Sequence, residues 1–228
     1  MHKVYKTENL NAGHRARIMR RFIAGNADTY DVMEMVLAGC MLRIDTESIM
    51  KRLFAKFGSA SGILSASISE LLNIDGIGEI TAIHIKGIHA LMLAGYEDRL
   101  GDAPVFQDAK ILRDYLLHML NGKRVEQARI LLLDSNKRLI SSLLISDGGF
   151  DGVNVDRQKI VKLALDSFAK HVILVHNHPD ASGAFSTSDV EATIGLKHAL
   201  HGVEIDLDDH YVVAGGAVYS MRELYLLD

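Results

Sequence analysis

The sequence predicts an α+β protein, in which an all-helical N-terminal part precedes a C-terminal domain that mixes strands with helices. Apolar residues recur at helical spacing early in the chain, as in 13–25. Beyond Pro104 the pattern changes, and apolar or β-branched runs such as 172–175 alternate with helical segments. The stretch between these two parts is polar. The expected organisation is an all-α domain at 1–98, a linker at 99–106 and an α/β domain at 107–228.

The composition indicates a packed, soluble protein, because 48% of the residues are hydrophobic and 24% are charged. No run of about 18 apolar residues marks a membrane span, and the N-terminus lacks the apolar centre of a secretory signal. Cys40 is the only cysteine, which excludes an internal disulfide and a cysteine-based zinc site. We therefore expect a cytoplasmic protein without a membrane partner.

The net charge of −4 argues mildly against a protein dedicated to nucleic-acid binding, since such domains are usually basic. The excess of acidic residues lies in 104–228, whereas the charges in 1–103 balance. Tight non-specific binding to DNA is therefore not what the bulk charge predicts.

Three helices are expected before the first glycine-rich segment. In 13–25 the apolar residues share one face, and four arginines form either a solvated surface or a small phosphate-facing patch. The segment 29–42 is rich in methionine, which fills core space, and either Thr29 or Asp31 caps it. The third helix covers 46–57 and ends before a glycine.

A short helix, a Gly-Ile-Gly turn and a longer helix are expected within 71–86. Glycine permits positive φ, and the N–H groups that begin the second helix can bind an anion. This pattern resembles the helix-hairpin-helix module, whose hairpin binds a DNA phosphate without reading sequence. The resemblance implies that Gly76, Ile77 and Gly78 form the hairpin and contact DNA non-specifically.

Two charged residues leave a second interpretation of this hairpin open. Glu79 follows the glycines directly and places a negative charge beside the expected anion site. Lys86 is the only cation within the next turn or two of the sequence. A hairpin that packs against protein and has no affinity for DNA explains the pattern equally well.

The C-terminal domain begins with a helix over 108–120. Residues 126–134 form a buried apolar strand, and a turn at Ser135-Asn136-Lys137 returns the chain as its hairpin partner. The remaining expected elements are that partner strand at 138–146, a Gly/Asp-rich loop at 147–155, a helix at 156–170, the strand at 172–175, a helix at 186–201, and strands at 203–207, 209–214 and 217–220.

Two histidines and an aspartate form the strongest candidate site. His176 and His178 end a buried strand two residues apart, so their imidazoles point to the same side, and Pro179 stops the strand. Ser186 begins the next helix, and Asp189 in its first turn can fold back toward the loop. Two neutral imidazoles and one carboxylate are the ligands of a catalytic zinc site that keeps a position open for water.

Each part of this pattern alone has an ordinary explanation, as a capping box or as structural histidines, but their combination has no simple packing rationale. The spacing His-x-His-Pro-x6-Ser-x2-Asp resembles the motif of the JAMM (MPN+) metallopeptidases, and Asn177 resembles their RadC branch. The resemblance implies a mixed sheet flanked by helices and a Zn²⁺ site made by His176, His178 and Asp189. It also implies a water as the fourth ligand and an oxyanion-stabilising role for Ser186.

Glu126 is the candidate general acid/base. It precedes an apolar strand that tolerates little charge, and could be a plain edge residue. In RadC-like sequences a glutamate precedes the same leucine-rich strand ending in aspartate, which Glu126 and Asp134 match. The resemblance therefore implies that Glu126 takes a proton from the attacking water and passes it to the leaving amine.

Asp209 and His210 match an Asp-His pair of the same family and could orient a metal ligand from behind, although a structural histidine is an equal alternative. The chain also departs from the family in two places. It keeps only the arginine of a usual Pro-Arg-Glu in 156–158, and Ser182-Gly183 lies two residues later than usual, although the loop keeps its length.

The motifs favour a RadC-like zinc-dependent peptidase or isopeptidase acting on a protein or peptide. The alternative is a DNA-binding accessory protein of repair or recombination that acts through the hairpin in 71–86. A zinc nucleobase deaminase is excluded, because its Pro-Cys-x2-Cys ligands are missing.

Overall fold

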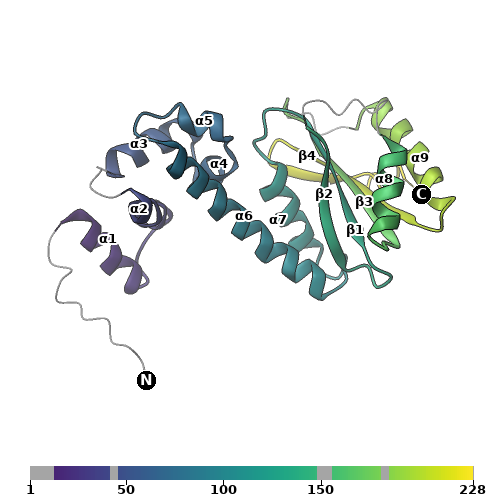
Figure 1. The fold of residues 1–228 in the computed structure, drawn as a ribbon, viewed down its shortest axis with the longest axis horizontal. Coiled ribbons are helices and arrows are strands. Elements are labelled where there is room, and N and C mark those ends of the chain that lie inside the picture. Colours follow the sequence, from purple (N-terminus) through teal and green to yellow (C-terminus); the bar gives the residue numbers. More distant parts are fainter. Residues whose placement is uncertain (1–12, 42–45, 148–155, 181–184, 228) are drawn as a thin grey trace, which may run out of the picture. The chain divides into compact units, whose positions relative to one another are not determined.

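The computed structural model describes residues 13–41, 46–147, 156–180 and 185–227 (Figure 1). The chain divides into two compact units, Met1–His89 and Ala90–Asp228. The predicted loop at 147–155, beyond its first residue, and the Ser182-Gly183 pair lie outside the described residues. The first unit contains α1 (His14–Ile23), α2 (Thr29–Cys40), α3 (Thr46–Phe57), α4 (Ala60–Ser65), α5 (Ile68–Leu72) and the first half of α6 (Glu79–Asp102).

Asp28 caps helix α2, which corrects the prediction of Thr29 or Asp31. The Asp28 carboxylate accepts a hydrogen bond from the backbone N–H of Asp31 at 2.8 Å. The Asp31 carboxylate in turn accepts one from the backbone N–H of Asp28 at 3.2 Å, which completes a capping box. Thr29 is already the first helical residue, so it cannot occupy the non-helical position that a cap requires.

The turn between α5 and α6 depends on Gly76, which has a φ of 91°. A Cβ atom at this position would lie 2.9 Å from Cδ1 of Ile49, which belongs to the core of the first unit. Both the left-handed backbone and this close approach require glycine. Gly78, in the same turn, has open space around the position of a Cβ atom.

We expect the substitution Gly76→Ala to destabilise the protein by about 1–3 kcal/mol, because alanine is strained at positive φ. Gly78→Ala is the matched control, and its effect on stability is expected to be much smaller. Denaturant unfolding of both variants followed by circular dichroism measures the difference. Equal stability of the two variants would show that the backbone at Gly76 relaxes without cost.

The polar stretch at 99–106 is not a linker. Its first four residues form the end of α6, which reaches Asp102. Leu100 and Val105 are 3% and 1% exposed and belong to the core of the second unit. Burial of these two apolar side chains determines the structure of the segment, despite its polar composition. The division between the units therefore falls earlier than predicted, within α6.

Five strands among the described residues of the second unit form one mixed sheet, in the order β2-β1-β3-β4-β5. The β3–β4 pair is parallel, and the other three pairs are antiparallel. The sequence predicted two strands, at 203–207 and 209–214, but the structure has one continuous strand, β4, which begins at Asp206 after the turn that leaves α9. The strands are β1 (Gln127–Leu133), β2 (Leu139–Asp147), β3 (His171–Asn177), β4 (Asp206–Ala214) and β5 (Ala217–Ser220).

Helices cover both faces of this sheet (Figure 1). Helix α7 (Ala109–Leu120) packs on one face, against side chains such as Ile173 and Val175. Helices α8 (Arg157–Asp166) and α9 (Thr187–His201) pack on the other face, against side chains such as Leu174. The alternation of a strand therefore assigns His176 to the face covered by α8 and α9. No helix within the described ranges combines the length and apolar character that crossing a membrane requires.

Candidate metal centre

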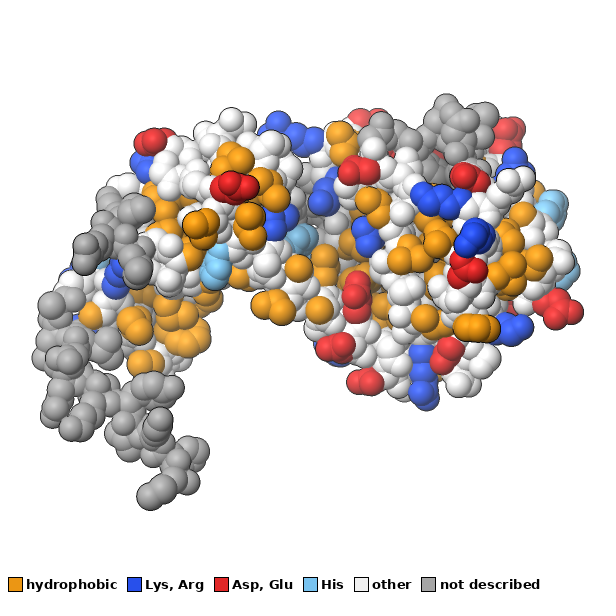
Figure 2. Space-filling model, viewed as in Figure 1, with side chains coloured by type: hydrophobic (Ala, Val, Ile, Leu, Met, Phe, Trp, Pro, Cys, Tyr) orange, Lys and Arg blue, Asp and Glu red, His pale blue; other side chains and the backbone are white. Residues whose placement is uncertain are grey.

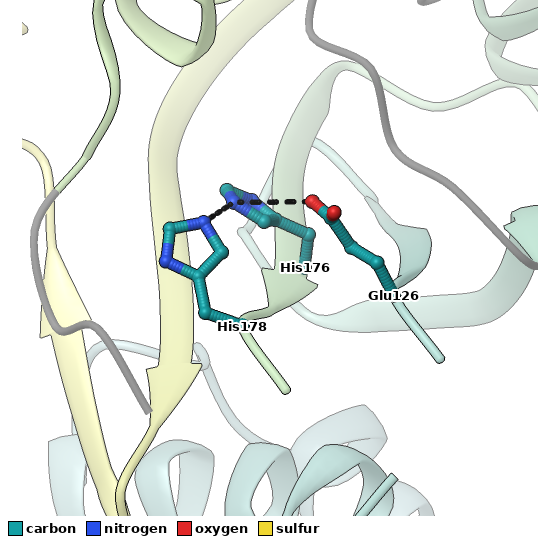
Figure 3. A group of neighbouring side chains, drawn as sticks. All are labelled: Glu126, His176 and His178. Carbon is teal, nitrogen blue, oxygen red and sulfur yellow. Dashed lines mark hydrogen bonds and ion pairs between the residues drawn. The ribbon is translucent and has the colours of Figure 1, made fainter. Parts of the chain in front are cut away.

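His176 and His178 lie where β3 ends, with their imidazoles beside the carboxylate of Glu126 (Figure 3). Nε2 of His176 is 2.8 Å from Nε2 of His178 and 4.0 Å from Oε1 of Glu126. One ligand atom from each of these three residues lies within 4.8 Å of the others. His176 is fully buried, whereas Glu126 is 25% exposed and can be reached by water.

Asp189 approaches both imidazoles from the first turn of α9. Its Oδ1 lies 3.5 Å from Nε2 of His176, and its Oδ2 lies 3.7 Å from Nε2 of His178. Oδ2 also accepts hydrogen bonds from the backbone N–H and the hydroxyl of Ser186, at 2.8 and 2.6 Å. The capping box at the start of α9 thus holds the carboxylate in place, and Oδ1 faces the buried histidine.

The position of Ser186 is explained by this cap. The residue is exposed, and its oxygen accepts a hydrogen bond from the backbone N–H of Asp189 at 3.1 Å while its hydroxyl binds the Asp189 carboxylate. Its direct partners are therefore Asp189 and the neighbouring hydroxyl of Ser188. The role of Ser186 in stabilising an oxyanion stays a prediction.

His176 is neutral at physiological pH in this environment. Burial lowers its pKa to about 3; the nearby Asp189 carboxylate opposes this shift, and His178 adds to it. Burial likewise places the pKa of His210 well below its usual range. A neutral imidazole has the nitrogen lone pair that a metal ligand needs, so His176 is suited to bind a metal ion.

A buried chain of hydrogen bonds runs behind His176. Its Nδ1 is 2.7 Å from Nε2 of His210, on β4. Nδ1 of His210 is 2.7 Å from Oγ1 of Thr193, which donates to the backbone carbonyl of Asp189 at 2.5 Å. Thr193 is fully buried on α9 and was not singled out from the sequence. His210 therefore lies behind the candidate ligand His176.

Asp209 does not take part in this chain. As the neighbour of His210 in a strand, it points to the opposite face of the sheet. Its carboxylate accepts hydrogen bonds from the hydroxyl of Ser220 at 2.6 Å and from the backbone N–H of Arg222 at 3.1 Å. Its Oδ1 also accepts a hydrogen bond from the backbone N–H of His210 at 2.7 Å. Asp209 thus holds the end of β5 and the residues after it, and its role in orienting a metal ligand stays a prediction.

Asn177 has a role that sequence reasoning missed. Its side-chain oxygen accepts a hydrogen bond from the backbone N–H of Gln127 at 2.9 Å. Its amide group donates to the carbonyl of Val125 at 3.2 Å. These two contacts bracket Glu126, so Asn177 holds the backbone that carries this carboxylate beside the histidines.

A cavity of about 390 Å³ lies beside His178. The end of α7, the end of β3 and the turn between β4 and β5 enclose it, and Lys123 and Arg124 contribute positive charge. Its volume lies within the range of about 300–1,000 Å³ that small-molecule sites occupy. A substrate segment placed there would lie next to the histidine pair.

Two cations near the predicted DNA-binding hairpin, Lys86 and Arg52, donate hydrogen bonds to backbone carbonyls of the first unit. Nζ of Lys86 donates to the carbonyls of Leu64 and Ala66, at 2.6 and 2.9 Å. Nε of Arg52 donates to the carbonyl of Asp75 at 3.0 Å, beside Gly76. On the face drawn in Figure 2, basic, acidic and apolar side chains are interspersed. Contact of Gly76, Ile77 and Gly78 with DNA stays a prediction.

The donor set fits Zn²⁺. This ion takes histidine nitrogen and carboxylate oxygen as ligands, and catalytic sites use three protein ligands and keep one position open. Here two imidazoles and the Asp189 carboxylate converge, and Glu126 lies close enough to serve as a base or as a further ligand. The buried chain behind His176 resembles the outer hydrogen bonds that orient metal-bound histidines.

Comparisons with known proteins agree with this architecture. Residues 106–226 match the family model described as a RadC-like JAB domain. A UPF0758 protein of Rhodobacter capsulatus is 31% identical over 92% of this chain and 100% of its own length. UPF0758 proteins of Shewanella loihica and Fusobacterium nucleatum are 30% and 29% identical, each over 95% of this chain and over 96% and 98% of their own lengths. The chain therefore belongs to the family of proteins with a RadC-like JAB domain.

Proposed function

We propose that the second unit is a zinc-dependent hydrolase that cleaves an amide bond of a protein or peptide, as a peptidase or an isopeptidase. The observation that carries this proposal is the convergence of Glu126, His176 and His178 within 4.8 Å at the end of a strand. Asp189 supplies a carboxylate to the same point. Two imidazoles and two carboxylates next to a cavity suit hydrolysis better than a purely structural role.

Zn²⁺ held by His176, His178 and Asp189 would lower the pKa of a coordinated water to about 7 and polarise the scissile carbonyl. Glu126 is the proton carrier in this scheme. It takes the proton of the attacking water and delivers it to the leaving amine, and its partial exposure lets water and substrate reach it. Asn177 keeps Glu126 in place through the backbone on either side.

Two further assignments complete the scheme. The hydroxyl of Ser186 turns from the Asp189 carboxylate to donate to the oxyanion that forms on the substrate. The substrate chain occupies the cavity beside His178, where Lys123 and Arg124 favour acidic groups. The hairpin of the first unit is not required for the chemistry.

The experiment that tests the proposal combines metal analysis with an assay of amide hydrolysis. We expect the purified protein to bind about one equivalent of Zn²⁺ and to cleave members of a library of peptides and lysine isopeptides. A chelator should abolish cleavage, and added Zn²⁺ should restore it. His201→Ala, which changes an exposed histidine at the end of α9, is the control and should behave as wild type. A zinc content no higher than that of a control protein without a metal site would refute the proposal.

A further inference from the structure

The hydroxyl of Thr193 determines where the protons lie in the buried chain of hydrogen bonds behind His176. Oγ1 of Thr193 lies 2.5 Å from the backbone carbonyl oxygen of Asp189, which can only accept a hydrogen bond. Two oxygens at this distance repel each other unless a hydrogen lies between them, so the one hydroxyl hydrogen of Thr193 points to Asp189. Thr193 must then accept the hydrogen bond that joins it to Nδ1 of His210 at 2.7 Å.

The direction of this hydrogen bond fixes the direction of the next one, between His210 and His176. His210 is fully buried, which favours its neutral form, and a neutral imidazole carries one N–H group. That group is Nδ1–H, because Thr193 accepts there, so Nε2 of His210 has a lone pair. It accepts from Nδ1–H of His176 at 2.7 Å. Nε2 of His176 is left with a lone pair, on the side where His178 and Asp189 converge.

We propose that Thr193 is a positioning residue, which acts through His210 to hold His176 in the tautomer whose Nε2 lone pair faces the candidate metal centre. The use of that lone pair for metal binding rests on the proposed function, but the hydrogen-bond chain does not require a metal. The chain of hydrogen bonds begins at the backbone carbonyl of one candidate ligand, Asp189, and ends at the imidazole of another, His176. It therefore couples the start of α9 to the end of β3.

The proton between the two candidate ligands is fixed by the same chain of hydrogen bonds. Nε2 of His178 lies 2.8 Å from Nε2 of His176, and one of the two must donate. Because Nε2 of His176 has the lone pair, His178 carries the hydrogen at Nε2 in the metal-free protein. A metal ion at the centre must displace this hydrogen, so binding should change the tautomer of His178 and leave those of His176 and His210 unchanged.

Nitrogen-15 NMR of the imidazole rings in the metal-free protein tests the assignment directly, since the two tautomers have distinct spectra. We expect Nδ1–H at His176 and His210, and Nε2–H at His178. Added Zn²⁺ should move only the His178 proton to Nδ1. A metal-free wild-type protein with His176 protonated at Nε2 would overturn the proposal, whatever the variants show.

Substitution of Thr193 tests its role. Valine has the same shape but cannot accept, so Thr193→Val should release His210 to the other tautomer and weaken zinc binding by about 10–100-fold. Thr193→Ser keeps the hydroxyl and should restore both the tautomer and the affinity. Thr81→Val, a buried threonine of the first unit, is the matched control and should bind zinc as wild type does. Equal zinc affinity of Thr193→Val and Thr193→Ser would contradict the proposal.

A second pair of variants covers the case in which Thr193→Val fails to fold. His210→Gln presents an amide oxygen to His176 and an amide N–H to Thr193, which preserves the direction of the chain, whereas His210→Leu breaks it. We expect His210→Gln to bind zinc at least 10-fold more tightly than His210→Leu. If the wild-type protein shows the expected tautomers but binds no zinc, the proposed function is refuted and the tautomer assignment stands.

Discussion

Replacing Glu126 with glutamine is expected to reduce kcat for amide hydrolysis by about 10²–10⁴-fold, with bound zinc unchanged. Glutamine has the same size but cannot accept the proton of the attacking water. The side chain is 25% exposed, so the substitution should not disturb folding. Steady-state kinetics and metal analysis on the same preparation measure the two quantities together.

This variant also distinguishes a general base from a metal ligand at Glu126. Both roles are open because the Glu126 carboxylate lies close enough to His176 for the two side chains to bind one metal ion. Loss of zinc together with activity would make Glu126 a metal ligand, and unchanged turnover would remove it from the reaction. Glu191→Gln is the control, since it makes the same chemical change at an exposed position of α9. Its kinetics should equal those of wild type.

Replacing either histidine with alanine should weaken zinc binding by more than roughly 100-fold, since outer-sphere partners alone contribute 10–100-fold. The two variants should differ in stability. His176→Ala removes the donor to the fully buried Nε2 of His210 and should destabilise the metal-free protein by about 1–3 kcal/mol. His178→Ala changes a more exposed side chain and should have a smaller effect.

Isothermal titration with Zn²⁺ and denaturant unfolding in the presence of chelator measure these two effects separately. The variant His198→Ala, on α9, provides the comparison for a histidine that was not assigned to the site. Stoichiometric zinc in a His176→Ala, His178→Ala double variant would place the metal elsewhere, and the assignment of the centre would be wrong.

The features that depend on local periodicity were predictable from the sequence. Period-two alternation in β3 places His176 and His178 on one side, and the turn at 135–137 produces the expected hairpin of β1 and β2. The capping pattern from Ser186 to Asp189 correctly marks the start of α9. The membership of the RadC-like JAB family and the mixed sheet were also expected, and both are confirmed.

The features that depend on long-range packing were not predictable in the same way. Thr193 acquires its role only because α9 packs against β4, which brings its hydroxyl to His210, 17 residues away in the sequence. The linker prediction overlooked that Leu100 and Val105 are apolar residues within a polar stretch, and both are buried. That the side chains of Asp209 and His210 make separate contacts was predictable from the sequence, because neighbouring strand residues face opposite sides of the sheet.

The Asp189 carboxylate, which belongs to the cap of α9 and to the proposed metal centre, affects how loss of the proposed chemistry would appear among relatives. Its Oδ2 is a fixed part of the cap of α9, whatever its Oδ1 does. A relative that no longer bound a metal would still be under selection to keep an aspartate there, because the cap stabilises the start of the helix. The aspartate is therefore weak evidence that a relative is active, and mutational drift away from catalysis should first be visible at His178 and Glu126.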